Sequence, residues 1–269
     1  MNKFATIATL ICVATFQPVL AAETGLVGQW TFDDGAGAIA ADASGNGNNG
    51  TLFAGGRAHP EWGEGAFAGS VGLSGGWGAY VQVPASASLN SVSEAITVTA
   101  LVYPRAIWVK GDKHNAFIAL AQRQWRQVQH PDQFYLGYGS QGDMLTYKWH
   151  VGLEGDDKNE LSLYRLPPDG SPPAIDRWVF VAGTYDGASG AMRLYVDGVL
   201  IGEDNRPGRI RLDAESLERP LALGAELNKP ELQMTSGSFN GYLGEVRLYN
   251  RALSPEEVMA LSRAALAAP

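Results

Sequence analysis

Residues 178–201 read WVFVAGTYDGASGAMRLYVDGVLI, in which short polar turns separate three apolar runs. Asp197-Gly198 lies between the runs Arg193–Val196 and Val199–Ile201. A type I′ turn needs positive φ at both central residues, and an Asp-Gly pair accepts this conformation readily. The pair therefore predicts a tight β-hairpin.

Short runs of β-branched and aromatic residues continue on both sides of this hairpin, bounded by Gly, Asn, Asp and Pro. Within one run, Ile96, Val98 and Ala100 alternate with threonines, so the three share one face of a strand. This texture predicts a sandwich of antiparallel strands. The runs expected to form strands are Val27–Phe32, Tyr80–Val83, Ile96–Tyr103, Phe117–Ala121, Phe134–Tyr138, Trp178–Tyr185, Met192–Val196, Pro220–Gly224 and Tyr242–Tyr249.

One helix is expected near the C-terminus. Ser254 suits the N-cap, Pro255 suits the first helical position, and Glu257 completes a capping box. Val258 and Leu261 supply a short apolar stripe for packing on the sandwich.

Composition limits the classes of function. The chain has 269 residues, of which 45% are hydrophobic and 18% charged, as in a folded globular protein. Its formal net charge of −8 argues against nucleic acid as a partner, because phosphate binding needs clustered Lys and Arg. A single cysteine excludes an internal disulfide framework, and no later stretch is apolar for long enough to predict a membrane span.

The N-terminus has the features of a secretory signal peptide. Lys3 precedes the apolar run Phe4–Phe16, and small residues follow at Ala21 and Ala22. We expect cleavage after residue 21, which removes the only cysteine, Cys12, and leaves residues 22–269 as one domain. The alternative is a buried N-terminal helix. The mature protein is expected to be secreted or periplasmic.

Three stretches in order resemble the laminin-G-like, concanavalin-A-like jelly-roll family. They are 30–35 with 42–52, 178–186 with 192–198, and 239–254. The resemblance extends from about Leu26 to Leu261. It implies an all-β fold, a jelly-roll sandwich of two antiparallel sheets, one of them concave, with the short C-terminal helix.

A cluster of oxygen-bearing side chains suggests a calcium site. Asp33, Asp34, Asp42 and Asn46 lie in a glycine-rich stretch, and calcium takes about six to eight oxygen ligands. Tight turns use the same residue types, so a turn is the alternative. The resemblance implies a structural calcium closed by an acidic residue, but this sequence has Gly244 there. Glu245 follows, and strict alternation predicts that its side chain points to the opposite face.

Residues 107–151 contain the candidate sugar-binding and catalytic side chains. Jelly-roll polysaccharide lyases remove a proton with Tyr or His while a cation neutralises the uronate carboxylate. His130, Tyr135 and Arg123 supply these types. Sugars stack on aromatic rings while polar groups fix the hydroxyls. The expected substrate-binding residues are Trp108, Trp125, Lys148, Trp149 and His150. The alternative is that Trp149 and the tyrosines are core residues and His130 lies in an exposed loop.

Another acidic segment, residues 154–160, is expected to be a solvated hairpin tip, because Gly-Asp-Asp-Lys-Asn is typical of turns. The sequence thus predicts a secreted domain that binds a carbohydrate or glycoconjugate, whether neutral or acidic, with calcium as the candidate cofactor. One alternative is a polysaccharide lyase or glycoside hydrolase acting in the concave cleft. Another is an adhesion module that binds protein at the cell surface. The oligomeric state is left open.

Overall fold

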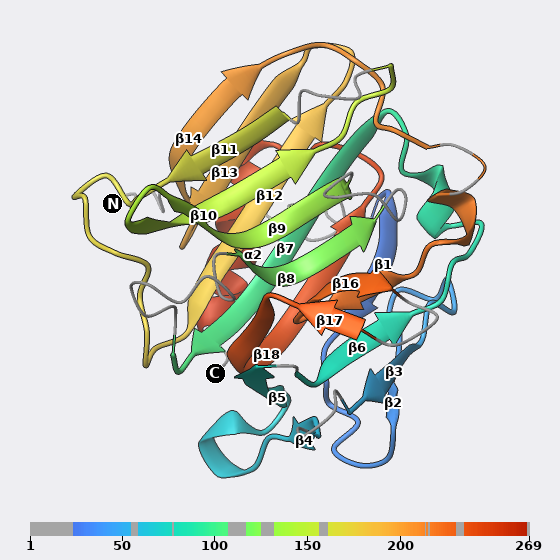
Figure 1. Cartoon of the computed structure of the whole chain (residues 1–269), viewed down its shortest axis with the longest axis vertical. Coiled ribbons are helices and arrows are strands. Elements are labelled where there is room, and N and C mark those ends of the chain that lie inside the picture. The colour runs from blue at the N-terminus through green and yellow to red at the C-terminus, as the bar shows by residue number, and fades with distance from the viewer. Residues whose placement is uncertain are drawn as a thin grey trace, which may run out of the picture.

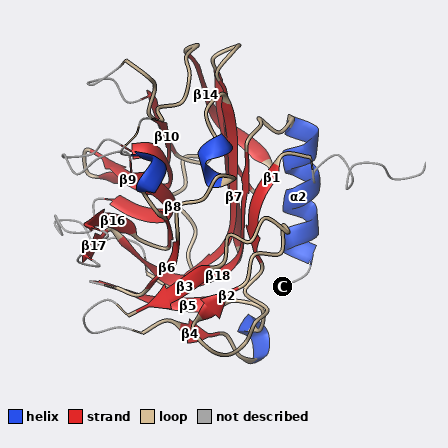
Figure 2. Cartoon of the chain, turned by 90° about the vertical axis from the view of Figure 1, so that its right-hand side faces the viewer, coloured by secondary structure: helices blue, strands red, loops and turns tan. Residues whose placement is uncertain are grey.

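Two antiparallel sheets pack face to face in the computed structural model of the protein, and helix α2 (Pro255–Ala267) lies against one of them (Figures 1 and 2). This arrangement confirms the predicted jelly-roll sandwich. Among the residues described, no helix is both long and apolar enough to cross a membrane. The structure describes residues 24–54, 59–76, 78–106, 117–124, 132–155, 161–212, 214, 216–229 and 234–267.

The first sheet, called sheet A, has β18 near its centre. Its strand order is β14-β13-β12-β7-β18-β5-β4, and β1 also pairs with β18. The strands of sheet A are β1 (Leu26–Trp30), β4 (Glu61–Trp62), β5 (Val71–Gly76), β7 (Ala95–Pro104), β12 (Val179–Asp186), β13 (Ala191–Val196), β14 (Val199–Asn205) and β18 (Ser238–Tyr249).

The second sheet, called sheet B, has the order β11-β10-β9-β8-β15-β6-β3-β2. Its strands are β2 (Ile39–Ala40), β3 (Gly50–Phe53), β6 (Tyr80–Val83), β8 (Phe117–Gln124), β9 (Asp132–Gln141), β10 (Met144–Val151), β11 (Leu161–Arg165) and β15 (Leu221–Leu223). Among the described residues, the remaining elements are the hairpin β16 (Glu226–Lys229) and β17 (Met234–Ser236), and three short 3-10 helices, η1 (Gly65–Phe67), η2 (Leu89–Ser91) and η4 (Ser216–Glu218).

Local features predicted from the sequence are confirmed. Asp197 and Gly198 have φ of 51° and 78°, and Val196 pairs with Val199 across the turn, as the type I′ hairpin requires. Ser254 and Glu257 form the capping box, with Ser254 N donating to Glu257 Oε2 at 2.8 Å. Glu154-Gly155 forms a turn after β10, whereas residues 156–160 lie outside the described residues.

A hydrophobic core fills the space between the sheets. Ile96, Val98 and Ala100 are buried in it, as their spacing predicted. Trp149 of β10 crosses the sandwich and lies over Gly183 of β12, and its indole N–H donates to Thr184 O at 3.1 Å. A Cβ atom at residue 183 would come within 2.3 Å of the Trp149 ring. Glycine at this position therefore allows the two sheets to pack closely.

One extra residue in β18 changes which side chains reach the outer surface of sheet A. The register of β18 against β7 shifts between Leu243 and Glu245, which is a β-bulge. Leu243 and Val246 both point into the core, so Gly244 and Glu245 between them both face outward. The expectation that Glu245 points away from the face of Gly244 was therefore wrong, because the bulge interrupts the alternation of side chains.

We predict that Gly183→Ala lowers the free energy of unfolding by about 1–3 kcal/mol, because the added methyl group overpacks the core against Trp149. Urea denaturation measures the loss. In a Trp149→Phe background the smaller ring leaves more room, so the same substitution should cost less. An equal cost in both backgrounds would show that the Trp149 contact is not the cause.

Candidate functional site

The sequence-predicted site residues fall on opposite faces of sheet B. Arg123 and Trp149 point toward the interior of the sandwich, whereas Tyr135, Lys148 and His150 lie on the outer face. Trp108, Trp125 and His130 lie outside the described residues. The structure thus brings together three of the eight predicted catalytic and substrate-binding residues.

Arg123 is a structural residue. Its side chain has no exposed surface, and its guanidinium donates to the carbonyl oxygens of Leu89, Ser216 and Arg219 and to the side chains of Asn90 and Gln133. All five N–H bonds are thereby used. Burial lowers the pKa of Arg123 to about 10, which leaves it charged at neutral pH. The predicted role of neutralising a substrate carboxylate does not fit, since no donor remains and no ligand can reach it.

Tyr135, Lys148 and His150 form a buried polar cluster on the outer face of sheet B. The Lys148 ammonium lies 4.5 Å from the centre of the Tyr135 ring, within cation–π range. The Tyr135 hydroxyl donates to Tyr138 O at 3.0 Å. Each of the three side chains belongs to a residue that is no more than 6% exposed. A sugar therefore cannot contact them in this arrangement, although their residue types suit sugar binding.

His150 is neutral in this cluster. Its Nε2 lies 3.4 Å from the carbonyl oxygen of Asp132, and its Nδ1 lies 3.0 Å from the Ser162 hydroxyl, so both ring nitrogens have a hydrogen-bonding neighbour. Burial, and then the nearby charge of Lys148, lower the pKa of His150 to about 3. The ring is thus held in one orientation by neutral hydrogen bonds.

Two of the residues predicted to bind calcium, Asp42 and Asn46, make hydrogen bonds within a turn. The Asp42 carboxylate accepts four hydrogen bonds, from the backbone N–H groups of Gln29, Ser44 and Asn48 and from the Ser44 hydroxyl. The Asn46 amide donates to the carbonyl oxygens of Leu26 and Val27.

Asp34 accepts from Ala41 N at 3.2 Å, whereas the neighbouring Asp33 lines a separate pocket. In the part of the chain that the structure describes, no three His, Cys, Asp or Glu residues are grouped to hold a metal. These hydrogen bonds are those that the turn alternative requires, and calcium binding by the four residues stays a prediction.

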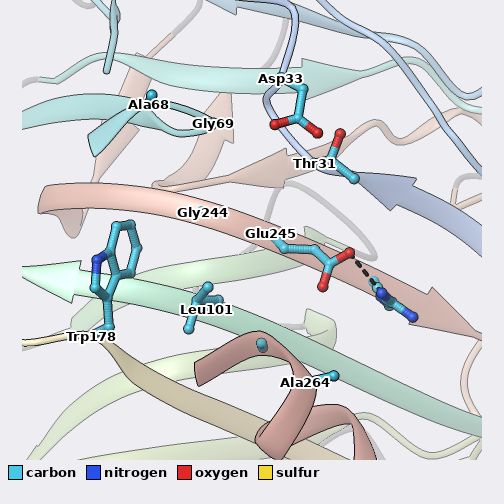
Figure 3. A pocket seen from close by; sticks show the side chains of 11 residues that line it. Thr31, Asp33, Ala68, Gly69, Leu101, Trp178, Gly244, Glu245 and Ala264 are labelled. Carbon is cyan, nitrogen blue, oxygen red and sulfur yellow. Dashed lines mark ion pairs between the residues drawn. The ribbon is translucent and has the colours of Figure 1, made fainter. Parts of the chain in front are cut away.

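A pocket of about 350 Å³ opens on the outer face of sheet A, beside the end of helix α2. We call it the outer pocket (Figure 3). The pocket is built by segments that lie far apart in the sequence. These are the chain after β1, the loop after η1, strands β7 and β18, the residue before β12, and helix α2. Its lining residues are Thr31, Asp33, Ala68, Gly69, Leu101, Trp178, Gly244, Glu245, Arg247, Ala264 and Ala265.

Two glycines keep the outer pocket open. A Cβ atom at residue 244 would lie 3.0 Å from Trp178 Cζ3 and 3.1 Å from Leu101 Cδ2, which is tighter than normal packing. At Gly69, which has φ of 72°, a Cβ atom would lie 2.7 Å from Asp33 Oδ1. Larger residues at these positions would displace the tryptophan or the carboxylate.

Polar groups line the rest of the outer pocket. Glu245 accepts from Gln29 Nε2 at 2.7 Å and from Arg247 Nη2 at 2.8 Å, and Figure 3 shows this ion pair along one wall. Burial acts to lower the pKa of Arg247, but the Glu245 carboxylate outweighs it and the pKa is raised. Asp33 and Thr31 make no side-chain hydrogen bond or ion pair with any described residue, so their oxygens are available to a ligand.

Aromatic packing fixes the position of Trp178. Its ring lies 5.6 Å from Tyr103 in an edge-to-face arrangement and 6.3 Å from Phe67. The ring remains partly exposed and its indole N–H has no partner among the described residues. Trp178 therefore presents apolar surface to the pocket, with the Cζ3–Cη2 edge of its ring beside Gly244.

The outer pocket was missed by sequence reasoning. Trp178 appeared only as the first residue of an apolar run, and its partners Asp33 and Glu245 are more than 60 residues away on either side. The one available signal was Gly244, which stands where the family resemblance implies an acidic residue.

Lowering the pH should destabilise the protein through His150. The unfolded state binds a proton at the ordinary pKa of 6.5, whereas the folded state does so only at about 3. The contribution of neutral His150 to the free energy of unfolding is therefore fully present above pH 6.5. It is lost as the pH falls toward 3, by up to about 1.4 kcal/mol per pH unit. Thermal melts of the wild type and His150→Gln across this range test it. Parallel pH profiles would contradict the assignment.

Removal of divalent cations should leave the melting temperature unchanged, because hydrogen bonds from the protein already occupy the Asp42 carboxylate. Calorimetry with and without EDTA measures this. Asp42→Asn should lower the melting temperature in both conditions, since the carboxylate organises the turn. A drop on adding EDTA to the wild type would instead support the predicted calcium.

Solved structures share this fold. Domain 4 of the extracellular GH43 arabinanase AbnA from Geobacillus stearothermophilus, in complex with arabinotriose, is similar at a TM-score of 0.60 and 18% identity, over 88% of this chain and 98% of that one. The binding domain of botulinum neurotoxin DC in complex with SialylT is similar at a TM-score of 0.61 and 12% identity, over 91% of this chain and 52% of that one. The binding domain of Paraclostridial Mosquitocidal Protein 1 has a TM-score of 0.60 and 14% identity, over 90% of this chain and 53% of that one.

The chain thus spans about half the length of the two toxin chains but nearly all of the arabinanase domain. No curated protein matches the sequence. Residues 74–259 match the laminin-G family model described as the concanavalin A-like lectin/glucanases superfamily. The chain belongs to this superfamily.

Proposed function

We propose that this protein is a secreted or periplasmic carbohydrate-binding domain and that the outer pocket binds the sugar. The observation that carries the proposal is the placement of Trp178 opposite the unpartnered side chains of Asp33 and Thr31. An aromatic surface with a few fixed polar groups is the usual composition of a site for a small polar ligand. The proposal of secretion is supported by the signal-like sequence of residues 1–21.

Each wall of the pocket matches one part of a sugar. The apolar face of a pyranose or furanose ring can stack on Trp178, whose position is fixed by Tyr103 and Phe67. Hydroxyl groups can donate to Asp33, Thr31 and Glu245, and carboxylate acceptors make the stronger hydrogen bonds. The Glu245–Arg247 pair offers donor and acceptor side by side, which suits a neutral ligand.

Structural neighbours support the ligand class. Domains of this fold have been solved in complex with arabinotriose and with SialylT. At 18% and 12% identity these likenesses establish the fold, and the ligands are those of the neighbouring proteins.

A lyase mechanism receives no support from the described residues. Arg123 and Tyr135, two of its three predicted catalytic residues, lie on opposite faces of sheet B, so they cannot act on one substrate. The experiment that follows distinguishes carbohydrate binding from the adhesion alternative, in which the protein binds another protein.

Retention of the purified protein in gels that contain neutral or acidic polysaccharides tests the proposal. The absorbance of each mixture is followed for unsaturated uronate products, which only the acidic polymers can yield. We expect retention without products. Asp33→Asn should weaken affinity for an oligosaccharide of the retained polymer about tenfold or more, because a hydrogen bond to a charged acceptor contributes about 1.5–3 kcal/mol. Calorimetric titration measures the change.

Asp34→Asn is the matched control, since Asp34 is adjacent in sequence and bonds to Ala41 N outside the pocket. It should leave affinity unchanged. Trp178→Ala should abolish retention, and circular dichroism checks that the variant folds. Equal losses in Asp33→Asn and Asp34→Asn would refute the pocket assignment. Product formation would favour the lyase, and absence of retention on every polymer would leave adhesion.

A further inference from the structure

A second pocket lies on the same outer face of sheet A, at the edge formed by β4 and β5. We call it the edge pocket. Its volume is about 280 Å³, and it is lined by His59, Glu61, Trp62, Gly72, Ser74, Arg105 and Tyr242. Aromatic side chains separate it from the outer pocket, since Tyr242 stacks on Phe67, which in turn lies beside Trp178.

Arg105 is held at the edge pocket by its backbone and by an aromatic ring. Its N–H donates to Asn240 O at 2.9 Å, which fixes the residue just after β7. Its guanidinium carbon lies 4.8 Å from the centre of the Tyr242 ring, in cation–π range. Phe67 covers the ring as well, with ring centres 4.1 Å apart and an interplanar angle of 10°. Tyr242 is therefore a rigid support for the guanidinium.

The Arg105 guanidinium has no carboxylate partner among the described residues. This sets it apart from five other arginines, which pair with acidic side chains: Arg177 with Asp197, Arg193 with Glu203, Arg209 with Glu94, Arg247 with Glu245, and Arg251 with Glu257. In a chain of net charge −8, acidic partners are abundant. A guanidinium without one, placed in a pocket, has its planar N–H groups available for a carboxylate ligand.

The other walls of the edge pocket suit a sugar ring. Trp62 is half-buried, and its indole N–H donates to Gly37 O at 2.9 Å, so its orientation is fixed. A Cβ atom at residue 72 would lie 2.9 Å from Tyr242 Cε1, so glycine keeps the floor open. Ser74 and Glu61 make no side-chain hydrogen bond within the described part of the chain and can bond to hydroxyl groups.

We infer that the edge pocket binds a sugar that carries a carboxylate, a uronate-type residue, with the carboxylate on Arg105. The choice of carbohydrate rests on the proposed function, whereas the site and the charge requirement are separate from it. A simple inorganic anion fits less well, because Glu61 would repel it and Trp62 would make no contact with it. A sugar acid places hydroxyl groups toward Glu61 and its ring against Trp62, and so uses the acidic and aromatic walls as well as Arg105.

Calorimetric titration with a panel of uronate oligosaccharides, beginning with trigalacturonate, tests the inference, and the methyl ester of each oligosaccharide is the neutral control. We expect the acid to bind at least tenfold more tightly than its ester, with affinity that falls as salt increases. Arg105→Gln and Trp62→Ala should each weaken binding of the acid at least tenfold. Arg193→Gln, at an exposed pair on β13, is the matched control and should change nothing.

Asp33→Asn should leave uronate binding intact, which separates failure at the outer pocket from failure here. The inference is overturned if acid and ester bind equally, if no uronate of the panel binds, or if Arg105→Gln leaves the affinity unchanged. Competition by inorganic phosphate with the same affinity in the wild type and Trp62→Ala would also overturn it, since the site would then recognise charge alone.

Discussion

The β-bulge at Gly244 is the constraint on which the outer pocket depends. β18 pairs with β1, β5 and β7, so a shift in its register is fixed from both sides of the strand. Because Leu243 and Val246 both remain in the core, the extra residue is forced outward, and Glu245 reaches the surface where Trp178 and Asp33 approach it. Gly244 itself leaves room for the tryptophan. A stability requirement of the core thus positions a surface site.

Most of the fold was predictable because its signals are local. Asp197-Gly198 specifies its own turn, Ser254 and Glu257 specify the start of α2, and Ile96, Val98 and Ala100 follow the period of a strand. Each requires only a few neighbouring residues, and the family match agrees with them. The bulge was not predictable in this way, because whether Glu245 faces inward depends on its pairing with Leu101, about 140 residues earlier.

The candidate site was predicted less well, for a related reason. Tyr135, Lys148 and His150 do come together, as alternation along β9 and β10 allows, but sequence does not reveal whether a sheet face is covered. Arg123 has a residue type suited to a substrate anion and is instead the centre of a buried network that ties η2, η4 and β9 together. The residues of the outer pocket come from six segments and those of the edge pocket from four, so no stretch of sequence contains either pattern.

The position of both pockets on one face of sheet A has a consequence for long polymers. Once one pocket holds a glycan chain, the second encounter becomes intramolecular, and its effective concentration is set by the length of chain between the two contacts. If both pockets bind sugars as proposed, a polymer that presents neutral and acidic residues at a matching interval would gain avidity that short fragments lack. The aromatic cluster between the pockets, built from Phe67, Tyr103, Trp178 and Tyr242, acts as a rigid spacer that fixes this interval. The fold would thereby select polymers by the spacing of their sugar residues as well as by the identity of single sugars.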